Sequence, residues 1–138
     1  MLIIHPNSIL RHPTTKLPED EDAQDLVDKL KYHMKLNGGL GLSAPQIGSH
    51  YSVFVIDDRD YDVFINPHII NKSEEECEFS EGCLSLPGQF ISISRPSEIF
   101  IEAENMKREK FRIHFYNHLA RVFQHEYDHL FGKLIIDY

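Results

Sequence analysis

The chain has 138 residues and a formal net charge of −8, with 14 Lys and Arg against 22 Asp and Glu. This balance argues against a nucleic-acid-binding protein, which needs a basic surface. Hydrophobic residues make up 41% and charged residues 26%, which is typical of a globular protein and predicts one domain over residues 1–138. No apolar run approaches the roughly 20 residues that span a bilayer, and the opening Met1–Ile4 is too short for an export signal.

The first predicted element is an amphipathic helix over Asp20–Leu36. Acidic residues crowd its start, which suits the helix dipole. An apolar stripe follows at helical spacing, formed by Leu26, Val27, Leu30 and Met34. Asn37, Gly38 and Gly39 are expected to end the helix.

The middle of the chain predicts short strands, because β-branched and aromatic residues alternate with turn-forming ones. The expected strands cover residues 53–56, 63–65, 91–93, 99–103 and 111–115. Asn105 marks a turn between the last two. The acidic run Glu74–Glu78 is expected to be a solvated loop or an edge strand.

A second helix is predicted over His118–Phe131, with Asn117 as N-cap and Gly132 as the C′ residue. Apolar residues lie on nearly all its sides, so this helix should be central. Two helices among many short strands predict an α+β fold.

The strongest chemical signal is the HExxH run His125–His129. Helical residues four apart lie on nearly the same face, so His125 and His129 can bind one metal ion, and Glu126 can act as general base on a water molecule there. The alternative is that both histidines only pack or cap. Ionisable side chains on an otherwise apolar helix are costly unless paired or metal-bound, which favours a metal.

A catalytic metal site usually has three protein ligands and one open position. Downstream of the motif, the position that holds a third ligand in related proteases is Ile135, and Asp137 lies too close to the helix end. The third ligand should therefore lie upstream.

The best upstream candidate is Cys83, in the segment Glu81–Gly88. Gly82 allows close backbone approach, and Pro87 and Gly88 predict a turn. A thiolate there suits Zn²⁺ or Fe²⁺, although a buried structural cysteine is the alternative. Cys77 lacks this setting. A disulfide between cysteines so close in sequence would constrain little, so we expect free thiols or a metal-bound thiolate.

A third segment, Gly39–Gln46, has the sequence GLGLSAPQ. It lacks the lysine and the glycine spacing of nucleotide-binding loops. Its glycines allow close approach to a ligand, and Gln46 can offer an amide to a developing oxyanion. A plain helix-to-strand turn is the alternative.

Together these segments resemble the three signature motifs of the peptide deformylase family. The family's glycine-rich stretch appears here as GLGLSAPQ, its second motif as EGCLS at 81–85, and its third, QHExDHLxG, at 124–132. All three keep the family's order and spacing. Shorter matches extend the resemblance over essentially the whole chain, at Pro6, Leu10, Arg11, Asn66-Pro67 and Arg95-Pro96.

The resemblance implies small, mostly antiparallel sheets wrapped around a central helix that carries HExxH. It implies removal of the N-formyl group from the formylmethionine of nascent polypeptides, with release of formate. It also implies a metal bound by Cys83, His125 and His129, with Fe²⁺ the usual ion and Zn²⁺ or Ni²⁺ able to occupy the site.

The resemblance further implies roles for residues around the metal. Glu126 would be general base and then general acid. The Gln46 side chain and the Leu84 backbone N–H would hold the oxyanion. Glu81 would form a supporting ion pair with Arg95. The candidate substrate-binding residues are Gly39, Gly41 and Glu81.

Two departures from the family pattern stand out. Ser43 replaces a residue that is more often Ala, a small change that should be tolerated. The sequence also stops at Lys133–Tyr138, where typical bacterial members continue into a C-terminal helix; short forms resemble those encoded by some phages. Because this helix is missing, we expect weak or no ribosome docking. We also expect a monomer in the bacterial or infected-host cytoplasm.

Two rival functions stay open at this point. One is an HExxH endopeptidase, against which the missing downstream ligand argues. The other is a non-catalytic metal-binding protein, whose closed site would need a fourth protein ligand that the sequence does not place.

Overall fold

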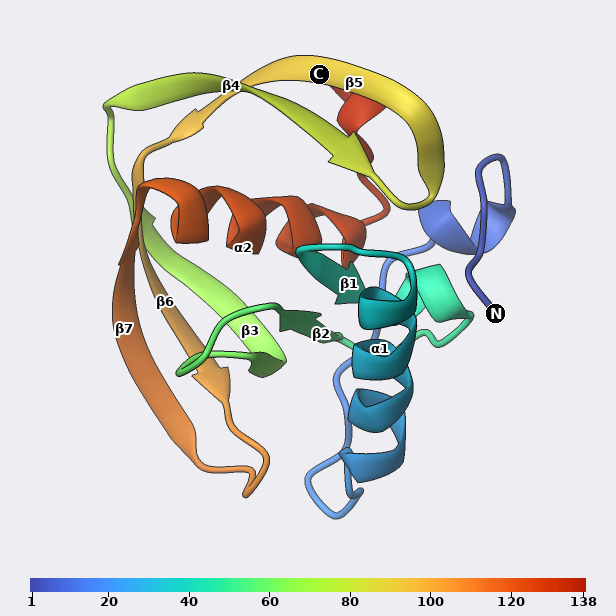
Figure 1. The fold of residues 1–138 in the computed structure, drawn as a ribbon. Helices are drawn as coiled ribbons and strands as arrows, with labels where there is room; N and C mark the ends of the chain where they lie inside the picture. The colour runs from blue at the N-terminus through green and yellow to red at the C-terminus, as the bar shows by residue number, and fades with distance from the viewer.

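The computed structural model describes residues 1–138 and has an α+β architecture, as the sequence predicts (Figure 1). The helices are α1 (Gln24–Leu36) and α2 (Asn117–His129). The strands are β1 (Gly41–Ser43), β2 (Val53–Ile56), β3 (Val63–Lys72), β4 (Glu76–Cys83), β5 (Leu86–Pro96), β6 (Glu98–Glu104) and β7 (Lys110–Tyr116). Three short 3₁₀ helices complete the fold: η1 (Ser8–Arg11), η2 (Ala44–Ile47) and η3 (Ile135–Asp137). No helix combines the length and apolar character needed to cross a membrane.

The strands form two separate antiparallel sheets. The larger has the order β1-β2-β3-β6-β7, and β4 and β5 pair with each other in a hairpin. Helix α2 lies between the larger sheet and this hairpin, which arches over it (Figure 1). On the sheet side, Phe123 packs edge-on against Phe54 and Phe64. The helix that carries HExxH is therefore central, as predicted.

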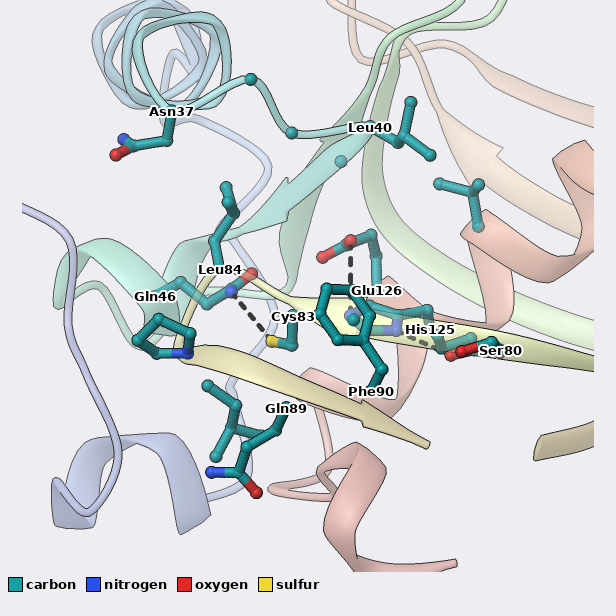
Figure 2. A pocket seen from close by; sticks show the side chains of 18 of the residues that line it. Asn37, Leu40, Gln46, Ser80, Cys83, Leu84, Gln89, Phe90, His125 and Glu126 are labelled. Carbon is teal, nitrogen blue, oxygen red and sulfur yellow. Dashed lines mark hydrogen bonds and ion pairs between the residues drawn. The ribbon is translucent and has the colours of Figure 1, made fainter. Parts of the chain in front are cut away.

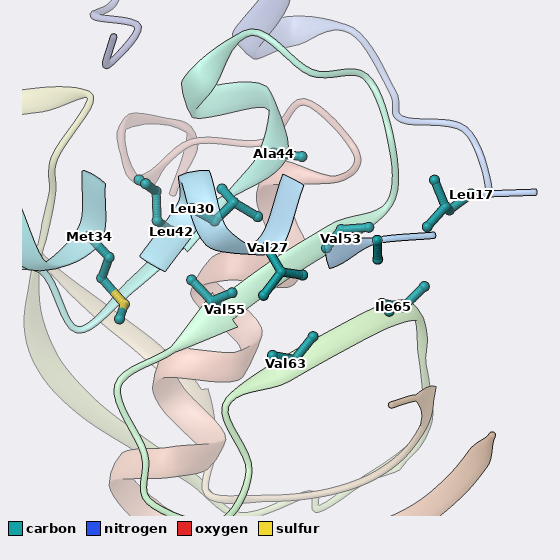
Figure 3. Close-up of a cluster of buried hydrophobic side chains, with 11 residues drawn as sticks. Leu17, Val27, Leu30, Met34, Leu42, Ala44, Val53, Val55, Val63 and Ile65 are labelled. Atoms are coloured by element: carbon teal, nitrogen blue, oxygen red, sulfur yellow. The ribbon is translucent and has the colours of Figure 1, made fainter. Parts of the chain in front are cut away.

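Helix α1 covers another part of the larger sheet (Figure 3). Its buried residues Val27, Leu30 and Met34 pack in one cluster with Val55 and other residues of β1, β2 and β3. The predicted start at Asp20 was too early: the helix begins at Gln24, whose backbone N–H donates to the Asp22 carboxylate. The predicted end is confirmed, because Gly38 has a φ of +67° and leads the chain towards β1.

Helix α2 begins one residue earlier and ends two residues earlier than the predicted His118–Phe131, although the expected glycine follows its end. Asn117 is not the N-cap; it is the first helical residue, and Tyr116 precedes it without a side-chain cap. Gly132 has a φ of +74°, and the N–H groups of Gly132 and Lys133 donate to the carbonyls of His129 and Asp128. This hydrogen-bond pair is the Schellman arrangement, with Gly132 at C′ as predicted.

The β4–β5 hairpin turns earlier than predicted. The turn lies at Leu84–Ser85, not at Pro87–Gly88. The partners shift from Gly82 with Phe90 to Cys83 with Leu86, so β5 bulges, and Gly88 takes a φ of +79° there. Residues 74–78 end in the exposed start of β4, so the edge-strand alternative holds. Both cysteines are free, as expected.

Candidate active site

The three motif segments meet around a cavity of about 670 Å³ (Figure 2). One wall comes from the segment between α1 and β1, a second from the β4–β5 hairpin, and a third from α2. All the candidate site residues line this cavity except His129, which is buried with its Nε2 next to Cys83 Sγ. The segment Gly39–Gln46 does connect α1 to β1, as the turn alternative has it, and Gly41 and Gln46 also line the cavity.

Cys83, His125 and His129 form a group that could hold a metal ion. Their ligand atoms all lie within 4.8 Å of one another, and Cys83 Sγ is 3.5 Å from His129 Nε2. The two histidines lie one helical turn apart on α2, as the HExxH spacing predicts, and Cys83 reaches them from the end of β4. One thiolate and two imidazoles are a donor set that suits a divalent transition metal.

The ring of His125 is oriented by Glu81. Burial by itself would raise the pKa of Glu81, but hydrogen bonds from Arg95 and His125 outweigh it and lower the pKa to about 2. The ionised carboxylate can only accept, so His125 Nδ1 donates to Glu81 Oε1, at 2.9 Å. This fixes the tautomer and leaves Nε2 of His125 for a metal.

Two arginines hold the Glu81 carboxylate. Arg95 on β5 donates through Nε at 2.5 Å and through Nη2 at 2.9 Å, which is the ion pair expected from the sequence. Arg121 on α2 adds a hydrogen bond of 2.5 Å, which the sequence reasoning missed. Its position four residues before His125 was an available signal, because that spacing places both on one helix face.

Glu126 is buried, and its two carboxylate oxygens have different surroundings. Oε1 accepts a hydrogen bond of 2.7 Å from the Ser43 hydroxyl, and Oε2 lies 4.0 Å from His125 Nε2. A Cβ at Gly41 would come within 2.7 Å of Oε2, so only glycine gives the carboxylate its place. Burial is the main cause that raises the pKa of Glu126 above its usual value, which suits a group that takes and returns a proton.

Gln46 is locked in place beside the cysteine. Its Oε1 accepts from the Ser43 backbone N–H at 2.9 Å, and its Nε2 donates to Ser85 Oγ at 3.1 Å and to Cys83 Sγ at 3.6 Å. The Ser85 contact was not predicted. The backbone N–H of Leu84, in the hairpin turn, makes no hydrogen bond within the chain. Two potential donors thus lie near the candidate cysteine ligand (Figure 2).

An HExxH helix that takes its third candidate ligand from an upstream cysteine, on an open cavity with a buried carboxylate, defines a metal-dependent hydrolase. The model of the polypeptide deformylase family matches residues 1–138. The chain belongs to this family, and it removes N-formyl groups from nascent polypeptides. The endopeptidase and non-catalytic alternatives are excluded accordingly.

Similar proteins support this assignment along the whole chain. A peptide deformylase of Borreliella burgdorferi is 38% identical over 99% of this chain and 86% of the relative. The solved structure of a peptide deformylase from Thermotoga maritima superposes with a TM-score of 0.95 at 34% identity, over 99% of this chain and 95% of that one. A probable peptide deformylase from Synechococcus phage S-SSM7 has the same TM-score at 33% identity, over 100% and 98%.

Proposed function

We propose that deformylation takes place at the metal site formed by Cys83, His125 and His129, with Glu126 as general base and then general acid. The observation that carries this assignment is the position of Glu126 Oε2, 4.0 Å from Nε2 of a candidate metal ligand. A divalent ion bound there supplies a Lewis acid that polarises the formyl carbonyl and makes water more acidic. We propose Fe²⁺ as the physiological ion, with Zn²⁺ or Ni²⁺ able to replace it, since a thiolate and two imidazoles accept all three.

The proton transfers fall to Glu126. It takes a proton from the attacking water and later gives it to the amine of the departing methionyl peptide. Burial raises the pKa of this carboxyl group, which makes the carboxylate a stronger base for the proton that it later returns.

Two hydrogen-bond donors would stabilise the oxyanion. The Gln46 amide and the Leu84 N–H stabilise the charge that develops on the formyl oxygen. The fixed orientation of Gln46 between Ser43 and Ser85 supports this role, because a donor held in advance needs no reorganisation during the reaction.

The segment that leads into β1 would bind the substrate. This strand has only β2 as a neighbour, so its other edge is free to pair with an extended peptide, and Gly39 and Gly41 let a backbone approach. Glu81 is better placed to support His125 than to bind substrate, since both its oxygens are occupied by Arg95, Arg121 and His125.

We also propose that residues 1–138 act as a single catalytic domain, as a monomer in the cytoplasm of a bacterium or of an infected host. The metal ligands, the base and the oxyanion donors all come from one chain, which supports the monomer. The net charge of −8 opposes docking on the polyanionic ribosome, so we propose weak or no association.

Activity on two substrates tests the proposal. The metal-loaded protein should release formate from formyl-Met-Ala-Ser and leave casein intact. Proteolysis of casein without formate release would contradict the proposed function.

A further inference from the structure

The hydroxyl of Ser43 makes a contact that the proposed mechanism has not yet used. Ser43 lies on β1, is fully buried, and donates to Glu126 Oε1 at 2.7 Å. The same hydroxyl lies 3.3 Å from the backbone carbonyl of Glu126, so the carboxylate is its closer acceptor. Ser43 does not line the cavity.

The backbone around Ser43 is held from two sides. Ser43 pairs with Phe54 of β2, and its N–H donates to Gln46 Oε1. The hydroxyl therefore projects from a fixed strand. The terminal torsion of a glutamate is soft, so its carboxylate can rotate unless a neighbour holds it.

We propose that Ser43 is a positioning residue for the reaction. Its hydroxyl holds Oε1 of Glu126, so that Oε2, which faces Nε2 of His125, is the oxygen that takes and returns the proton. This inference rests on the proposed role of Glu126 as the base. It also revises the expectation that a serine at this position is merely tolerated.

Ser43→Ala is the direct test, because it removes one oxygen atom and adds no bulk. We expect kcat on formyl-Met-Ala-Ser to fall about tenfold, as for a group that acts only in the transition state, with KM and metal content unchanged. Ser97→Ala is the matched control. Ser97 is also buried and donates to a backbone carbonyl, that of Glu75, and neither residue lines the cavity, so loss of this hydroxyl should leave kcat unchanged.

The Ser43→Ala substitution, repeated in the Glu126→Asp variant, distinguishes a positioning role of Ser43 from a general effect on the structure. Glu126→Asp withdraws the carboxylate by one methylene from the reach of Ser43. Adding Ser43→Ala to this variant should then change kcat by less than about twofold, because the two residues no longer interact. Ser43→Cys, with a similar shape and a weaker donor, gives the same comparison where the alanine variant does not fold.

The outcomes are distinct. A wild-type kcat for Ser43→Ala, a loss of metal in that variant, or the same tenfold loss in the Glu126→Asp background would each overturn the inference. Glu126→Gln, measured in parallel, tests the base. An active Glu126→Gln would remove the proposed function and this inference together, whereas an inactive Glu126→Gln beside a fully active Ser43→Ala would remove only the inference.

Discussion

Glu81 Oε1 accepts a hydrogen bond of 2.9 Å from Nδ1 of His125, and this leaves the other ring nitrogen, Nε2, for a metal. The carboxylate is in turn held by Arg95 and Arg121, and its side chain is only 6% exposed. A buried carboxylate with two arginines and an imidazole is a rigid support for the candidate metal ligand His125. The pairing implies that Glu81 acts on metal affinity and on stability at once.

Replacing Glu81 with Gln should lower both the metal affinity and the stability of the protein. The neutral amide no longer compensates the positive charges of Arg95 and Arg121, which should lower the free energy of unfolding by about 3 kcal/mol. Metal affinity should fall about 10- to 100-fold, since the partner that orients His125 is weakened. Denaturant unfolding and metal titration measure the two effects. Glu78→Gln, on an exposed position of the same strand, should change neither; equal metal affinity in Glu81→Gln and the wild type would contradict the supporting role.

The two cysteines should differ sharply. Cys83→Ala should strip or greatly weaken metal binding, because it removes one of the three proposed ligands. Cys77→Ala should keep it, since Cys77 is exposed on β4 and no metal-ligand group includes it. Metal content per chain after dialysis distinguishes them. A protein that needs Cys77 and not Cys83 for its metal would refute the ligand assignment.

Stability should depend on pH through Glu104, away from the site. Burial would raise its pKa, but hydrogen bonds from Arg108 and Asn66 outweigh burial and lower the pKa below 4.5. The stabilisation is therefore fully present above pH 4.5 and is lost as the pH falls through the lower folded pKa. Glu104→Gln should cost about 2 kcal/mol of unfolding free energy at pH 7 and progressively less in acid.

The matched control is Glu98→Gln, at an exposed position of the same strand, which should show no such pH-dependent difference from the wild type. Urea unfolding from pH 7 down to pH 3 provides the measurement. A difference between Glu104→Gln and the wild type that stays constant across this range would be inconsistent with the lowered pKa.

The identity of the metal should set the lifetime in air. A thiolate beside redox-active Fe²⁺ is open to oxidation, whereas Ni²⁺ is not expected to promote it. The Fe²⁺ form should lose activity in aerated buffer while the Ni²⁺ form retains it. Equal half-lives of the two forms, measured by formate release over time, would argue against thiolate ligation of a redox-active ion.

Local patterns predicted much of the site, because helix geometry links residues close in sequence. The HExxH spacing placed His125 and His129 on one face of α2, and Gly132 ended that helix as expected. The hairpin turn was misplaced, since the bulge at Gly88 follows from strand pairing rather than from turn preference alone.

The motifs did bring Cys83 to the two histidines, but contacts between distant segments that carry no motif escaped prediction. Ser43 and Glu126 are 83 residues apart, and Tyr138 reaches Arg95 and Asp128 from the end of the chain. Such pairs depend on how β1, β5 and η3 pack around α2, which no local periodicity encodes. Ser43 contacts the proposed base Glu126, and Tyr138 contacts Arg95, which in turn holds Glu81.

The most direct test of Glu126 as the general base is formate release from formyl-Met-Ala-Ser by the metal-loaded wild type and Glu126→Gln, with metal content measured in the same samples. The amide keeps the shape of the side chain but cannot act as a base near neutral pH. We predict one metal per chain in both proteins, rapid formate release by the wild type and none above background by the variant. Substantial turnover by Glu126→Gln with its metal in place would contradict the central claim.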